Sequence, residues 1–173
     1  MMTSGEIRAF RAQLSLPQQA ELFDYWHSLS DSGDLPRRAD FSPRDIPHLL
    51  PNICLLDMSP GPEVFRVRLA GTALREIYGR EITSETLLSD GWEASRDYWR
   101  RSIEMVIRED RPAAGMLRAP SSDKDHLVQF WLRLPMQGTA PGERIILGLD
   151  ISQAVSTVDK ALLGPGADHC ATA

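Results

Sequence analysis

The sequence predicts an α+β fold, in which a five-stranded antiparallel sheet carries helices on one face and is preceded by an N-terminal flanking helix. Five short segments show the two-residue alternation or the apolar run of a strand, and they fall into a group of two and a group of three. The clearest helical pattern lies between the groups, at residues 92–110. Two strands, a helical crossover and three further strands describe an antiparallel sheet covered on one face.

The N-terminal part is predicted to be helical over residues 5–30. Pro17 suits a first helical turn, and the residues after it place four apolar side chains on one stripe. The stripe consists of Leu22, Phe23, Trp26 and Leu29. Turn-forming residues at 31–34 end the helix. Because a large apolar patch usually marks a contact, the stripe must cover either the chain's own sheet or a second copy in a two-fold dimer.

A short helix and the first hairpin follow. Ser42 can cap the helix, Pro43 suits its first position, and Pro51 stops it. The two strands are predicted at 53–58 and 63–70, with a turn at the Ser-Pro-Gly-Pro sequence between them. In the second strand, alternation points one set of side chains inward (Phe65, Val67 and Leu69) and the other outward (Arg66 and Arg68).

Two helices are predicted between the strand groups. Residues 71–78 have helical spacing, and Gly79 suits the C-terminal stop. Residues 82–90 are expected to be a loop with a helical turn. Residues 92–110 place Trp92, Trp99, Ile103 and Val106 on one face. The opposite face carries opposite charges four residues apart, each pair contributing about 0.3 kcal/mol.

Three strands close the predicted sheet, at 112–119, 126–136 and 144–151, with a turn at 138–142. Residues 152–160 are expected to form a short helix, and the tail from Gly164 to be flexible.

Several segments carry a resemblance to a known family. They are the stretch from Leu35-Pro36-Arg37-Arg38 to Pro43-Arg44-Asp45-Ile46, the step Leu50-Pro51-Asn52-Ile53, the strand Phe65-Arg66-Val67-Arg68-Leu69-Ala70-Gly71-Thr72, and the block Leu132-Arg133-Leu134-Pro135-Met136 followed by Ile146-Leu147-Gly148. In this order, and with the helix between the strand groups, the chain resembles short stand-alone bacterial PAS-domain proteins over about residues 30–152.

The resemblance implies a PAS fold, frequent homodimerisation and a role in signalling. Residues 1–34 would be an N-terminal helical extension, 35–152 the PAS-like domain, and 153–173 a short helix and flexible tail. PAS domains use such flanking helices to form dimers, so we expect the N-terminal stripe to meet a second copy. Burying its four side chains would contribute about 6–10 kcal/mol before ordering costs.

The function we expect is a non-catalytic sensory or signalling module that acts through protein–protein interaction, with or without a small-molecule ligand. These 173 residues show no kinase, cyclase or DNA-binding segment, so a signalling protein partner or self-association would carry the output. The alternatives are a small NTF2-like enzyme, whose helices usually precede its sheet, and a ligand-free scaffold. Fold alone does not choose among functions.

Charge and composition exclude some classes of partner. A net charge of -5 and a pI near 5.4 argue against nucleic-acid binding, which needs a basic surface. The N-terminus has no apolar signal-peptide core, and no stretch approaches the about 20 apolar residues that span a bilayer. Two cysteines, Cys54 and Cys170, make no disulfide framework. We therefore expect a cytoplasmic protein.

We find no metal or catalytic motif. None of the four histidines (His27, His48, His126 and His169) lies three to five residues from another. The single adjacent acid–histidine pair is Asp125-His126, with Ser121 and Ser122 nearby, and neighbouring strand residues point to opposite faces. No cofactor is predicted. Haem is disfavoured because residues 92–110 contain no histidine, and a cysteinyl flavin because residues 71–91 contain no cysteine.

Five residues are candidates for binding a ligand. Arg68 and Arg133 each alternate with apolar neighbours, which predicts the outer sheet face and pairing with acids. Alternatively, Arg68 anchors an acidic ligand or a partner, because guanidinium binds carboxylates in bidentate fashion. Trp92, Trp99 and Trp131 are expected in the packing between helix and sheet, where they could line a ligand cavity.

Overall fold

The computed structural model describes residues 2–30, 33–58, 65–87, 89–93, 95–118, 127–154 and 169–172. Its α-helices are α1 (Ser4–Gln13), α2 (Pro17–Ser28), α3 (Thr72–Tyr78) and α4 (Arg96–Glu109), with short 3-10 turns η1 (Arg38–Asp40), η2 (Pro43–Asp45) and η3 (Leu50–Asn52). Its strands are β1 (Ile53–Met58), β2 (Phe65–Ala70), β3 (Ala113–Arg118), β4 (Leu127–Gln137), β5 (Arg144–Ala154) and β6 (His169–Thr172).

The strands form one antiparallel sheet in the order β2-β1-β5-β4-β3-β6. This confirms the five predicted strands and adds β6 at the β3 edge. Two expectations about the C-terminal part, a helix at 152–160 and a flexible tail from Gly164, are wrong for the residues that the structure describes; residues 155–168 lie outside them. Residues 152–154 extend β5, because the long β4 offers backbone partners as far as the Leu127–Ala154 pair, and 169–172 pair with β3. The expected turn at 59–62 lies outside the described residues.

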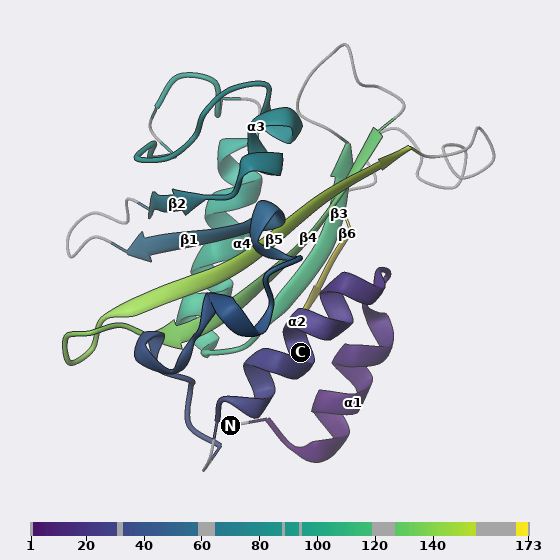
Figure 1. The fold of residues 1–173 in the computed structure, drawn as a ribbon, viewed down its shortest axis with the longest axis vertical. Coiled ribbons are helices and arrows are strands. Elements are labelled where there is room, and N and C mark those ends of the chain that lie inside the picture. Colours follow the sequence, from purple (N-terminus) through teal and green to yellow (C-terminus); the bar gives the residue numbers. More distant parts are fainter. Residues whose placement is uncertain are drawn as a thin grey trace.

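Helices cover both faces of the sheet (Figure 1). Successive strand residues point to opposite faces, and the buried side chains accordingly form two cores. One core packs α3 and α4 against the sheet and includes Trp131 and Ile146, and the other packs α1 and α2 against it and includes Leu132 and Leu147. The second face is as apolar as the first, so it also needs a cover.

The N-terminal stripe supplies that cover within the same chain. Leu22 and Phe23 are fully buried and Trp26 nearly so, while Leu29 is partly buried at the margin. The indole of Trp26 donates to the Pro135 carbonyl of β4 at 2.9 Å. The structure therefore corrects the expectation that these four side chains meet a second copy. They lie on the chain's own sheet because both faces of β4 and β5 are apolar.

A bulge changes the alternation predicted for β2. Leu55 pairs with Leu69, but Leu56 pairs with Val67, so Arg68 is an extra residue in its strand. Phe65 and Val67 are buried as predicted, whereas Leu69 is 46% exposed. The prediction that Leu69 faces inward is wrong because the bulge reverses the faces beyond it.

The two helices between β2 and β3, α3 and α4, begin later than predicted and end close to their predicted ends. α3 ends at Tyr78, and Gly79 has the left-handed φ of 70° that suits a helix stop. α4 begins at Arg96, not at residue 92, and Ser95 is its N-cap with non-helical angles of φ -118° and ψ 1°. Trp92 is therefore buried from a loop.

Candidate functional site

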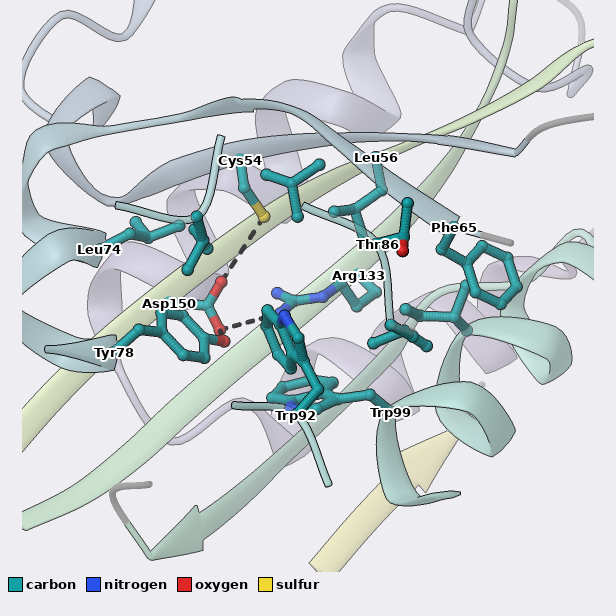
Figure 2. A pocket seen from close by; sticks show the side chains of 14 residues that line it. Cys54, Leu56, Phe65, Leu74, Tyr78, Thr86, Trp92, Trp99, Arg133 and Asp150 are labelled. Carbon is teal, nitrogen blue, oxygen red and sulfur yellow. Dashed lines mark hydrogen bonds and ion pairs between the residues drawn. The ribbon is translucent and has the colours of Figure 1, made fainter. Parts of the chain in front are cut away.

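A cavity of about 30 Å³ lies between the sheet and its α3/α4 cover (Figure 2). Its walls come from three sources. The strands contribute Cys54, Leu56, Phe65, Val67, Arg133 and Asp150; the helices contribute Leu74, Tyr78, Trp99 and Ile103; and the segment between the helices contributes Ile82, Thr86, Leu87 and Trp92. Apart from one ion pair the walls are mainly apolar and aromatic, as in a small-molecule pocket.

That ion pair joins Arg133 of β4 to Asp150 of β5. Their side chains are 3% and 1% exposed, and Arg133 Nη2 lies 2.9 Å from Asp150 Oδ1. Arg133 Nη1 also donates to the carbonyls of Leu132 and Leu149 at 3.0 and 3.2 Å. The Trp99 ring centre lies 4.8 Å from the guanidinium carbon. Opposite charge, carbonyls and an aromatic face together offset the loss of hydration.

The two carboxylate oxygens of Asp150 are unequally used. Oδ1 also accepts a hydrogen bond from Gln129 Nε2 at 2.7 Å and a long one from the Tyr78 hydroxyl at 3.5 Å. Oδ2 faces the Cys54 thiol at 3.6 Å, and a thiol is a weak donor. Two buried polar atoms in this cluster, Arg133 Nε and Gln129 Oε1, have no hydrogen-bond partner within the described part of the chain. The cluster therefore keeps unused capacity for hydrogen bonding.

The protonation states of the cluster are set by burial and by the ion pair. Burial has the largest single effect and lowers the pKa of Arg133, but the charge and hydrogen bond of Asp150, with Cys54 and Tyr78 nearby, together raise that pKa overall, so Arg133 stays charged. Burial raises the pKa of Cys54 to about 12 and the pKa of Tyr78 well above its ordinary value. The thiol and the phenol are therefore neutral near pH 7, and the thiol is not a reactive nucleophile.

Gly148 makes room for the arginine. It pairs with Cys54 of β1 and with Arg133 of β4. A Cβ at position 148 would come within 2.4 Å of Cys54 Sγ and 3.0 Å of Arg133 Nη1. The expectation that Arg133 lies on an outer sheet face is wrong, because β4 is central in the sheet and is covered on both faces.

One wall of the cavity is formed by the described residues between α3 and α4 (79–87, 89–93 and 95), which we call the cover segment. Its fold is held by Glu85, which accepts hydrogen bonds from Arg80 at 3.1 and 3.0 Å and from the Trp92 indole at 2.7 Å. Two backbone hydrogen bonds, Val67 N to Glu85 O and Ser84 N to Val67 O, tie it to β2. These polar contacts hold the cover segment together with the buried side chains of Ile82, Leu87 and Trp92.

The structure brings together four of the five candidate ligand residues. Trp92, Trp99 and Arg133 line the cavity. Trp131 lies behind Trp99, with ring centres 5.6 Å apart, and its indole donates to the Tyr98 hydroxyl at 2.9 Å. Arg68 is not among the lining residues, because it lies exposed in the β2 bulge, 3.5 Å from Asp57.

Arg68→Ala is expected to change the free energy of unfolding by less than about 1 kcal/mol, because half-exposed ion pairs contribute little. Urea unfolding followed by tryptophan fluorescence measures this change. A loss above about 2 kcal/mol would contradict the surface role.

Sequence reasoning missed three members of the cluster: Asp150, Gln129 and Tyr78. The available signal was a polar residue at the centre of an apolar strand. Asp150 follows Ile145 to Leu149, and Gln129 lies between Val128 and Phe130. The expected pair Asp125-His126, with Ser121 and Ser122, lies outside the described residues.

The described residues bring together no group of three or more His, Cys, Asp or Glu side chains that could hold a metal ion. They also contain no helix with the length and apolar composition needed to cross a membrane.

Comparison with models of known protein families identifies the family of this chain. A family model described as a PAS domain matches residues 14–150, well over half of the chain. The curated proteins contain no match. The matched range includes α2, the strands β1, β2, β3 and β4, most of β5, and every residue that lines the cavity.

Proposed function

The chain belongs to the PAS-domain family, and from this premise we propose that it is a non-catalytic sensory module that binds a small molecule in the cavity over Arg133 and Asp150. The family supports a sensory or signalling role. The observation that carries the ligand is the aromatic-lined cavity with a buried ion pair, of which one guanidinium nitrogen finds no partner among the described residues. Buried polar atoms without partners are rare in folded proteins and call for an explanation.

The output would pass to a protein partner or to self-association. A ligand can shift a conformational equilibrium by its difference in affinity for the two states. The cover segment and α4 both line the cavity, so both would respond to an occupant. The β2 margin, where Arg68 and Leu69 are exposed, is a surface that a partner or a second copy could contact. Haem and cysteinyl flavin remain disfavoured as occupants because residues 92–110 contain no histidine and residues 71–91 contain no cysteine.

The ligand-binding part is tested by filling the cavity. Val67→Phe adds a ring to a buried wall, whereas Leu69→Phe makes a similar change at an exposed site on the same strand. We expect denaturation of the wild type and of Leu69→Phe to release the same small molecule, and Val67→Phe to release none. Mass spectrometry of the released material measures this, and an absorption spectrum taken first should lack a haem band.

The size of the cavity favours a second candidate function, a ligand-free scaffold. About 30 Å³ holds one or two water molecules. Wild-type protein that releases no small molecule, when produced in its native host, would support the scaffold and contradict the sensor.

A further inference from the structure

We propose that the cavity takes an uncharged, planar ligand that carries both a hydrogen-bond acceptor and a donor, as a carboxamide does. This inference rests on the ligand-binding function proposed above and adds the chemical class of the ligand.

Charge is the first argument. Among the residues that line the cavity, Arg133 and Asp150 are the charged ones, and they form an ion pair with each other. The lining is therefore electrically neutral as a whole. A carboxylate or an ammonium ligand would bring an unbalanced charge into an apolar cavity, at a large desolvation cost. An uncharged polar ligand avoids this cost.

The unused hydrogen-bonding groups are the second argument. Arg133 Nε is a buried donor that finds no partner among the described residues, so it calls for an acceptor on the ligand. Of the contacts among these residues, Asp150 Oδ2 receives the weak one from the Cys54 thiol at 3.6 Å, so it calls for a donor. Both side chains line the cavity and are paired through Arg133 Nη2 and Asp150 Oδ1 at 2.9 Å, so one ligand can reach both. A carboxamide carries an acceptor C=O and a donor N–H within one planar group.

The walls and the entry decide the shape. Phe65, Tyr78, Trp92 and Trp99 surround the ion pair, and flat rings pack well against flat rings. A ring is larger than the about 30 Å³ of the cavity, so the cover segment must move to admit it. The ion pair between Arg80 and Glu85, which helps to hold this segment, is partly exposed, with side-chain exposures of 31% for Arg80 and 20% for Glu85. Trp92 would then report binding through its fluorescence.

The test uses three molecules of one shape: benzamide, benzoate and protonated benzamidine. They differ in charge and in donors and acceptors, so size does not distinguish them. With the intact wild-type chain we expect benzamide to bind with a Kd lower than either ion by about tenfold or more, as one unpaired buried polar group would cost. Tryptophan fluorescence and calorimetry measure the three affinities. Leu69→Phe should bind benzamide like the wild type, and Val67→Phe should not bind it.

Each other outcome overturns the proposal in a distinguishable way. Tightest binding by benzoate or benzamidine would keep the cavity as a ligand site but refute the uncharged class. Equal binding by Val67→Phe would place the site elsewhere. Binding of none of the three would refute the class, while the mass of any molecule released on denaturation decides the ligand-binding function separately.

Discussion

Arg133→Met is expected to lower the free energy of unfolding by about 3–5 kcal/mol, because it leaves the Asp150 carboxylate buried without its counter-charge. Methionine keeps much of the volume of the arginine stem, so the loss reports mainly on charge. Gln129 and Tyr78 would still donate to Asp150, but neither carries a positive charge. Urea unfolding followed by fluorescence, with the slope of the transition checked for two-state behaviour, measures the change.

Two controls separate the ion pair from packing. Removing both charges in Arg133→Met/Asp150→Leu should restore much of the stability, since an apolar pair of similar volume often replaces a buried ion pair at little cost. Arg11→Met breaks the half-exposed ion pair with Asp24 and should cost less than about 1 kcal/mol. A cost below about 1 kcal/mol for Arg133→Met would show that Asp150 does not depend on the guanidinium.

Phe23→Ala is expected to lower the free energy of unfolding by about 3–5 kcal/mol, through lost burial and a cavity under α2. Phe23 is fully buried and packs against Phe10 and Trp26, with ring centres 5.2 and 5.9 Å apart. Because these contacts lie within one chain, the loss should not depend on protein concentration. Urea unfolding at two concentrations tests both the size of the loss and its origin.

The neighbouring residue gives a matched control for that measurement. Asp24→Ala changes a half-exposed side chain on the same helix turn and should cost less than about 1 kcal/mol. A loss for Phe23→Ala that shrinks at high protein concentration would instead show that the stripe contacts a second copy. Deleting the N-terminal helices should leave no folded monomer, because Leu132, Leu134 and Met136 would face water.

Patterns in the sequence predict five of the described strands, β1 to β5, but not β6. Local alternation and turn residues depend on neighbours along the chain, so β1 was predicted at its exact bounds, and β2 to β5 near theirs. The stop of α3 at Gly79 follows from one residue's backbone preference in the same way. The predicted start of α4 is wrong because Trp92 continues the apolar stripe, and periodicity does not distinguish a side chain buried from a helix from one buried from a loop.

Which faces of the sheet are covered, and whether Arg133 and Asp150 are buried together, depends on tertiary packing and does not follow from local sequence patterns. Alternation assigns Arg133 and Leu132 to opposite faces, but it does not say that both faces are buried. That depends on α2 and α4 reaching β4 from opposite sides, and on Gly148 leaving space for the guanidinium. The partner of Arg133 is Asp150, 17 residues further along, and it is brought there by the β4–β5 pairing. A buried charge is stable only beside its counter-charge, and that proximity arises from the packing of the whole sheet, not from spacing along the chain.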